Sequence, residues 1–265
     1  MLTLNVNSLQ DFALSRSVLE AAGLAARLPA VEILWDNFCH LQAEALAQHL
    51  LVIADRASFH VMWSRFLERD QSSLEELLER LSSHVRAVKP ITVSEHLCRF
   101  TSGGLNLPEP CEHSYDDLDH TSRRVEAYQR AIGMPLLLEN FASNEQRAEK
   151  QIAFLERLMA RTGCGLLFDI SNAVVGSLNQ LGDLDVWLQF LVGKCVPCHV
   201  GSYAHNPATA LFQDTHATDV SALTLGAVDR FRAAGCIASV SYERDANKDV
   251  GAMAHDLRQL AERLK

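Results

Sequence analysis

Residues 135–170 read PLLLENFASNEQRAEKQIAFLERLMARTGCGLLFDI and contain one complete strand–helix–strand unit. The apolar runs Pro135–Asn140 and Gly165–Ile170 are typical of short buried strands. Between them, Ser143 and Gln146 are expected to cap a helix that a glycine ends. A strand, a helix and a second strand in this order are the repeating unit of α/β folds.

The same alternation runs along the whole chain, without a linker or a low-complexity tract. The other expected strands are Leu2–Val6, Val31–Trp35, Ala57–Met62, Ile91–Leu97, Cys195–Gly201 and Ile237–Tyr242. The other expected helices are Ser8–Ala22, Leu41–His49 continued through Leu50–Ile53, a helix capped by the box Ser73–Glu76, Tyr115–Ile132, Asp183–Val192, Val220–Ala234 and Val250–Leu264. Gly103–Pro108 is expected to be a loop.

Eight alternations in 265 residues are typical of a (β/α)8 TIM barrel, which we expect to form one domain over residues 1–265. An open, doubly wound sheet is the structural alternative. Such a sheet often carries a glycine-rich phosphate-binding turn after its first strand, and Val6–Asp11 contains no glycine. The barrel is therefore favoured.

Composition excludes several classes of protein. With 48% hydrophobic and 22% charged residues, the chain is an ordinary globular protein, and no apolar run is long enough to span a membrane. The first thirty residues lack the basic leader and apolar core of a secretory signal, so we expect a cytoplasmic protein with seven reduced cysteines. A net charge of −9 argues against non-specific binding to nucleic acid.

Acidic and imidazole side chains stand at the ends of six expected strands, where a barrel carries its active site. These candidate residues are His60, His96, Glu139, Asp169 with Asn172, His199 and Glu243. Asp214 and His216 follow the seventh strand, and in an extended segment their spacing would turn both side chains to the same side. One end of the barrel is thus expected to collect all nine.

So many acids and imidazoles would repel one another and lose hydration unless a cation compensates them. Because one catalytic metal takes about three or four protein ligands, nine candidates imply about two or three metal ions. Iron, manganese and zinc all accept this mixture of donors, which does not choose among them. Asp245 is expected either to orient a ligand or to accept a proton, with a structural salt bridge as the alternative.

The stretch Cys195-Val-Pro-Cys198-His199 has the letters of a c-type haem attachment site. That modification requires export, and the motif overlaps an apolar strand whose histidine already belongs to the barrel mouth. We therefore expect the two cysteines to be buried small hydrophobes, with a redox pair as the second option.

The ordered motifs resemble the multinuclear non-heme iron-dependent oxidases, which are TIM-barrel enzymes that modify peptide cysteines. The motifs are Ser94-Glu-His-Leu97, Leu138-Glu-Asn140, Phe168-Asp-Ile-Ser-Asn172, His199, Asp214-Thr-His216 and Glu243-Arg-Asp245. The segment His199-Val-Gly-Ser-Tyr203 is most similar to the MbnB-type branch, the methanobactin biosynthesis oxidases. The first strand, Leu4-Asn-Val-Asn-Ser8, lacks the glycine-rich, arginine-ending start of many relatives.

The resemblance implies three sets of iron ligands. These are His60, His96 and Glu139; Glu139, Asp169, His199 and Glu243; and Asn172, Asp214 and His216. It further implies two or three irons per chain in mixed Fe(II) and Fe(III) states, with O2 as cosubstrate. The implied reaction converts peptidyl cysteine into an oxazolone and an adjacent thioamide. The implied partners are an MbnC-like protein in a heterodimer and an MbnA-like precursor peptide.

Three alternatives remain open from the sequence. One is an oxidase of the same family that acts on a different cysteine-containing ribosomal peptide. Another is a metal-dependent sugar isomerase or phosphoesterase, because such barrels also carry His/Asp/Glu metal sites. The last is a metal-storing or scaffold subunit without catalytic activity.

Overall fold

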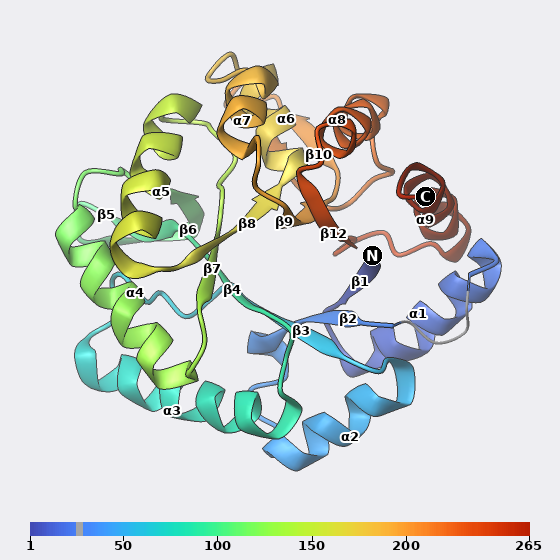
Figure 1. The fold of residues 1–265 in the computed structure, drawn as a ribbon, viewed down its shortest axis with the longest axis horizontal. Coiled ribbons are helices and arrows are strands. Elements are labelled where there is room, and N and C mark those ends of the chain that lie inside the picture. The colour runs from blue at the N-terminus through green and yellow to red at the C-terminus, as the bar shows by residue number, and fades with distance from the viewer. Residues whose placement is uncertain (25–28) are drawn as a thin grey trace.

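Eight parallel strands form a closed barrel in a computed structural model that describes residues 1–24 and 29–265. Around the barrel the strands follow the order β1-β12-β9-β8-β7-β4-β3-β2, and helices surround them (Figure 1). The strands are β1 (Leu2–Val6), β2 (Val31–Leu34), β3 (Ala57–Val61), β4 (Val93–His96), β7 (Leu136–Glu139), β8 (Gly165–Asp169), β9 (Val196–Val200) and β12 (Ile237–Tyr242). The (β/α)8 fold expected from the sequence is confirmed.

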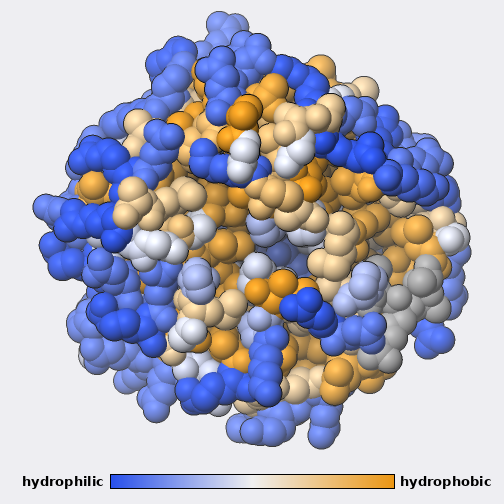
Figure 2. Space-filling view, in the orientation of Figure 1, coloured by the Kyte–Doolittle hydropathy of each residue, from blue (hydrophilic) through white to orange (hydrophobic). Residues whose placement is uncertain are grey.

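Helices connect successive strands and cover the outside of the barrel. They are α1 (Leu9–Ala22), α2 (Ala43–Ile53), α3 (Gln71–Val88), α4 (Leu118–Ile132), α5 (Ala148–Thr162), α6 (Ile170–Leu178), α7 (Leu184–Leu191), α8 (Ala222–Ala233) and α9 (Val250–Arg263), with the 3-10 turn η1 (Trp35–Asn37). Hydrophilic residues coat the rim of the molecule, while hydrophobic residues gather toward its middle (Figure 2).

Strand alternation separates the core from the site. On β8, Phe168 points outward and packs against Trp187 of α7 and Phe231 of α8, with ring centroids 5.3 and 4.9 Å apart. The next residue, Asp169, therefore points into the barrel. On β3, Phe59 is fully buried beside the inward-pointing His60 in the same way. Hydrophobic burial against the helices thus fixes the direction of each polar side chain.

Two antiparallel hairpins extend from the barrel strands, and the sequence did not predict them. One pairs β5 (Cys98–Ser102) with β6 (Leu105–Glu112), which corrects the loop expected over Gly103–Pro108. Its turn is Gly103-Gly104 with φ of 56° and 80°, backbone angles that glycine adopts readily and that match the twist of a hairpin. The other hairpin pairs β10 (Tyr203–Asn206) with β11 (Leu211–Asp214).

Two expected helix caps were wrong. Helix α3 begins earlier than the box at Ser73, because the Asp70 carboxylate accepts the Ser73 backbone N–H at 3.0 Å. Helix α5 begins at Ala148 without a side-chain cap, so Ser143 and Gln146 precede it. The Gln146 N–H instead donates to Glu112 Oε2, 3.0 Å away, which ties this segment to the first hairpin.

Candidate metal centre

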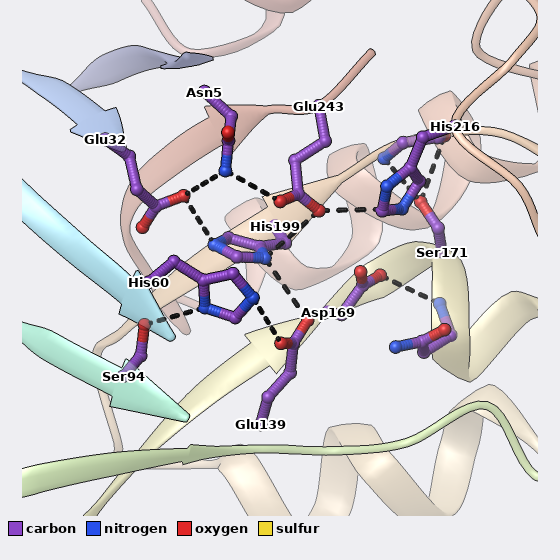
Figure 3. A network of polar contacts seen from close by, with 12 residues as sticks. Asn5, Glu32, His60, Ser94, Glu139, Asp169, Ser171, His199, His216 and Glu243 are labelled. Carbon is purple, nitrogen blue, oxygen red and sulfur yellow. Dashed lines mark hydrogen bonds and ion pairs between the residues drawn. The ribbon is translucent and has the colours of Figure 1, made fainter. Parts of the chain in front are cut away.

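Glu139, the last residue of β7, lies close to three imidazole rings. Figure 3 shows two of them, those of His60 and His199. Its Oε2 is 3.2 Å from His96 Nε2 and 3.4 Å from His60 Nε2, and its Oε1 is 3.2 Å from His199 Nδ1. Burial alone would raise the pKa of Glu139, but the nearby imidazoles, led by His96, outweigh burial and lower it. One oxygen of this carboxylate thus faces His60 and His96, and the other oxygen faces His199.

His199 occupies the middle of the network and is fully buried. Its Nδ1 lies 3.1 Å from Glu243 Oε2, on the side that also faces Glu139. Its other nitrogen, Nε2, lies 2.8 Å from Glu32 Oε1. Asn5 joins this pair to the rest of the site, because its Nδ2 donates to Glu32 at 3.2 Å and to Glu243 at 3.0 Å.

His216 meets Asp214 as expected, although not through an extended segment. His216 has a left-handed φ of 46°, and its backbone N–H donates to Ser202 O at 2.9 Å. This turn brings His216 Nε2 to 2.7 Å from Asp214 Oδ2 and 3.5 Å from Glu243 Oε2. The two residues come together because the chain reverses after β11, so the alternation argument gave the right contact for the wrong reason.

Four groups of side chains place their donor atoms within 4.8 Å of one another. The first group is His60, His96 and Glu139; the central group is Glu139, Asp169, His199 and Glu243; the outer group is Asp169, Asp214 and His216; and a further set is His60, His199 and Glu243. The first and central groups coincide with the expected ligand sets. The outer group shares Asp214 and His216 with the third ligand set that the resemblance implies. It contains Asp169, whereas that set contains Asn172.

Asn172 nevertheless lies at this site. Its backbone N–H donates to Asp169 Oδ1 at 2.8 Å, because Asp169 caps helix α6. Its side-chain Nδ2 donates to Asn140 O at 3.0 Å. Asn140 in turn accepts the Asp169 backbone N–H at 2.6 Å. The amide of Asn172 is thereby held with its oxygen free to bind a ligand.

Several buried oxygen atoms of the centre accept no hydrogen bond from any residue that the structure describes. They are Glu139 Oε2, Asp169 Oδ2, Asn172 Oδ1 and Asp214 Oδ1. A buried polar atom without a partner is costly, and anionic oxygens that converge are costlier still. Metal ions among these atoms would relieve both costs, so the residues fit a metal centre.

The tautomer of His60 leads to the same conclusion. Ser94 Oγ donates to Phe59 O at 3.3 Å and lies 2.9 Å from His60 Nδ1, so both contacts are made when Nδ1 carries the imidazole hydrogen. His60 Nε2 then directs a lone pair toward the carboxylate of Glu139. Two lone pairs that face each other repel, whereas a cation between them would bind both.

Protonation follows the balance of burial and charge at each position. Burial lowers the pKa of His60 to about 3, which leaves its ring neutral and able to bind a metal. Burial raises the pKa of Asp169 well above its usual range, and the nearby carboxylate of Asp214 raises it further. Burial would lower the pKa of His199, but carboxylates led by Glu243 raise it well above its ordinary value. Without a metal, shared protons must balance these carboxylates.

Asp245 contacts the centre through His216. Its Oδ2 lies 3.1 Å from His216 Nδ1, and its Oδ1 accepts a hydrogen bond from Asn7 Nδ2. Burial would raise the pKa of Asp245, but the hydrogen bond and the charge of His216 lower it. Asp245 therefore contacts a candidate ligand, His216, and belongs to none of the four donor groups found among the described residues.

Sequence reasoning missed Glu32 and Asn5. Each is buried on an early strand and points into the barrel, where both bond to members of the central group. Glu32 lies in Val-Glu-Ile-Leu, where a charged residue interrupts an expected buried strand. That interruption was the signal, because a buried charge needs a partner.

The Cys195–His199 stretch is part of strand β9 and its flank. Cys198 is buried and Cys195 is exposed, so only Cys198 is the buried small hydrophobe expected of both. Their spacing places the two side chains on opposite faces of an extended strand, which disfavours a redox pair. All seven cysteines are free.

A cavity of about 440 Å³ opens onto the candidate metal centre. His96, Asn172 and Asp214 contribute to its lining, so the first and outer groups meet this space. The residues of the central group are almost completely buried. A substrate would therefore reach the centre from the side of His96 and Asp214.

Comparison with known proteins identifies the family. A family model described as "RiPP precursor modification enzyme MbnB/TglH/ChrH" matches residues 20–264. The chain belongs to this family. Membership confirms the resemblance seen in the motifs.

Individual relatives agree with this assignment. A UPF0276 protein of Caulobacter vibrioides is 31% identical over 162 residues, which cover 58% of this chain and 58% of that protein. A UPF0276 protein of Rhizobium meliloti is 35% identical over 108 residues, which cover 39% of this chain and 35% of that protein. The matched region thus spans between a third and three fifths of these two relatives.

Solved structures share the fold at low sequence identity. An L-ribulose 3-epimerase has a TM-score of 0.66 at 15% identity, with 100% of this chain and 95% of that chain covered. A zinc-bound structure of IOLI protein has a TM-score of 0.67 at 13% identity, with 99% and 97% covered. Endonuclease IV from Thermus thermophilus has a TM-score of 0.55 at 16% identity, with 98% and 99% covered. These likenesses concern the barrel alone.

Among the described residues, no helix is both long and apolar enough to cross a membrane.

Proposed function

We propose that this chain is a multinuclear iron-dependent oxidase that uses O2 to modify cysteine residues of a methanobactin-type precursor peptide. The modification gives an oxazolone and an adjacent thioamide. Family membership supports the peptide substrate, and four overlapping groups of imidazole and carboxylate donors support the metal. The observation that carries the proposal is the position of Glu139, which belongs to both the first and the central group.

A carboxylate shared by two donor groups suits adjacent metal ions, because each of its oxygens can bind one of them. His60 and His96 approach Oε2 of Glu139, while His199 approaches Oε1. Zinc has no redox chemistry, whereas oxidation by O2 requires a metal that changes its oxidation state. When bound, iron would supply that capacity, together with the charge that deprotonates a coordinating thiol.

The chain's own residues determine how the peptide meets this centre. The cysteine side chain enters the cavity and reaches its lining at His96, Asn172 and Asp214. The buried central group excludes water beneath this point, which strengthens the electrostatic interactions within the site. Asp245 holds His216 by its Nδ1, which presents Nε2 toward Asp214 and Glu243.

The reaction balances as a four-electron oxidation. The cysteine and the adjoining peptide unit lose their hydrogens as protons and electrons, and O2 accepts them to become water. Four bonds to hydrogen are broken, at the cysteine β-carbon, sulfur and backbone nitrogen, and the peptide C–N bond after the cysteine is broken as well. That nitrogen bonds to the β-carbon to give the thioamide, and the oxygen of the preceding carbonyl bonds to the freed carbonyl carbon to close the oxazolone ring. No oxidant other than O2 is required.

A partner protein belongs to the proposal. The matching family is described as modifying peptide precursors. The cavity of about 440 Å³ beside the candidate metal centre opens on the side of the two hairpins. An MbnC-like protein in a heterodimer would hold the precursor so that its cysteine enters the cavity. Activity of the single chain at the full rate would remove this part of the proposal.

An oxidase that acts on a different cysteine-containing peptide is the second candidate. The family description groups three kinds of precursor-modifying enzyme, which favours this alternative. The products differ in mass. Loss of about four hydrogens per cysteine supports oxazolone and thioamide formation, whereas loss of a carbon unit supports the alternative.

The test is mass spectrometry of the precursor peptide after incubation with the anaerobically purified complex. We expect the loss of hydrogens only after O2 is admitted and only in the presence of iron. Turnover of an aldose or a phosphodiester without O2, with no change in the peptide, would contradict the proposal.

A further inference from the structure

Trp63 is the exposed tryptophan of this chain. The other two, Trp35 and Trp187, are 1% and 2% exposed, whereas Trp63 is 44% exposed. It follows strand β3 and lines the same cavity as His96. An exposed indole beside candidate metal ligands requires an explanation, because indoles at such positions commonly anchor a binding partner.

Contacts within the chain hold the backbone of Trp63 and pack its ring on one side. Its backbone N–H donates to Asp36 Oδ1 at 3.2 Å, and that of Met62 donates to Asp36 Oδ2 at 2.8 Å. Its ring lies 5.4 Å from the ring of Phe100 on the first hairpin. The guanidinium of Arg65 in turn lies 5.3 Å from the centroid of Phe100. A surface that is ordered in advance loses little conformational entropy on binding.

The lining of the cavity around Trp63 is mixed. Its apolar walls are Met62, Pro110, Phe141, Ala142 and the indole, and its neutral polar residues are Asn144, Asn172, Gln213 and Thr215. Its charged lining residues, apart from His96, are the acids Glu109 and Asp214, and no lysine or arginine of the described chain contributes to it. Such walls favour an apolar side chain and disfavour an acidic one.

We propose that Trp63 and these walls form a subsite for an apolar side chain next to the reacting cysteine of the peptide. The inference rests on the proposed function, which brings the cysteine to the lining near His96. Successive residues of an extended peptide are about 3.5 Å apart, so a neighbouring side chain stays within the same cavity. The subsite selects among cysteines by the residue that adjoins each one.

The experiment measures peptide binding without oxidation. Synthetic hexapeptides Gly-Ser-Cys-X-Gly-Ser, with X as leucine, glycine, lysine or aspartate, are titrated into the Fe(II)-loaded complex under nitrogen. Binding is followed by calorimetry and by tryptophan emission. Because Trp35 and Trp187 are buried, a blue shift of the emission that Trp63→Phe abolishes assigns the contact to Trp63.

We expect the leucine peptide to bind about tenfold more tightly than the glycine peptide, a difference of about 1.4 kcal/mol. The aspartate peptide should bind most weakly. Trp63→Ala should remove the preference for leucine, and Trp63→Phe should keep part of it. Leu223→Ala removes another exposed apolar side chain, on α8, and should leave binding unchanged.

Equal binding of the leucine and glycine peptides, or a preference that survives in Trp63→Ala, would overturn the subsite. Tighter binding of the lysine peptide than of the leucine peptide would overturn its apolar character. A leucine preference that depends on Trp63, followed by no oxidation in O2, would contradict the proposed function and leave the subsite intact. Oxidation of the peptide without a leucine preference would support the proposed function and contradict the subsite.

Discussion

Glu32 Oε1 lies 2.8 Å from His199 Nε2, at the ring nitrogen opposite the one that faces Glu139 and Glu243. Glu32 belongs to none of the four donor groups found among the described residues. A carboxylate held against the outer nitrogen of a ligating histidine orients that ring. Glu32 therefore contacts His199 at Nε2 and orients the ring so that Nδ1 faces Glu139 and Glu243.

Glu32→Gln should weaken one metal-binding step and spare the others. The amide keeps the shape of the side chain and removes the charge that orients His199. Loss of such an outer contact typically weakens metal affinity by about 10- to 100-fold. Equilibrium dialysis with Fe(II) under nitrogen should show this decrease for one ion per chain, while the first group retains its ion.

Asp256→Asn is the matched control for Glu32→Gln. Asp256 is a fully buried carboxylate on α9 that accepts a hydrogen bond from Tyr242 at 2.9 Å. Its loss should lower stability without changing metal affinity. Equal weakening of metal binding in both variants would mean that Glu32 acts only through the stability of the barrel.

Gly201→Ala should disable the outer group. A Cβ at Gly201 would lie 2.3 Å from His216 Cδ2 and 2.7 Å from its Nε2, so the imidazole would have to move. The displaced ring would lose Asp214, so we expect a variant that binds about one metal ion fewer, measured by mass spectrometry of metals per chain. Gly226→Ala on α8, where a Cβ meets no atom within 4 Å, should bind the full number. Full metal content in Gly201→Ala would exclude His216 as a ligand.

Periodicity predicted the barrel and six strand ends because each strand buries one face against helices. Phe168 had to pack outward, so Asp169 had to point inward. The two hairpins were not predicted because the pairing of β5 with β6 and of β10 with β11 depends on contacts across a turn. For Gly103-Gly104, a glycine pair between short runs is compatible with both a loop and a type I′ hairpin.

Candidate ligands could be predicted better than the residues that hold them. His60 and Glu139 stand at strand ends, where the fold itself assigns a function. Glu32 and Asn5 lie within early strands, and their importance depends on contacts with residues far along the chain, such as Asn5 with Glu243. Sequence spacing carries no information about such contacts, which arise only when the barrel closes.

His113 should make the protein sensitive to acid. Its ring packs 5.4 Å from Tyr115 and 5.5 Å from Phe154, and its Nε2 has no hydrogen-bond partner in residues 1–24 and 29–265. Burial lowers the pKa of His113 from its usual 6.5 to about 4. The unfolded chain therefore binds a proton that the folded chain resists, and stability is lost as the pH falls from about 6.5 to about 4.

His113→Phe should remove this part of the acid sensitivity. The phenyl ring keeps the aromatic contacts and has no proton to gain. Urea midpoints measured at pH 7 and pH 5 should differ less for the variant than for the wild type. An unchanged pH dependence would show that His113 titrates normally in the folded protein.

The iron content of anaerobically purified protein, compared with that of Glu139→Gln, tests the central claim most directly. Because Glu139 belongs to the first and central groups, we predict about two or three irons per wild-type chain and at most about one in the variant. Glu156→Gln, on the exposed face of α5, should match the wild type. A single zinc or manganese ion in the wild type, or iron that Glu139→Gln leaves unchanged, would contradict a multinuclear iron centre built on Glu139.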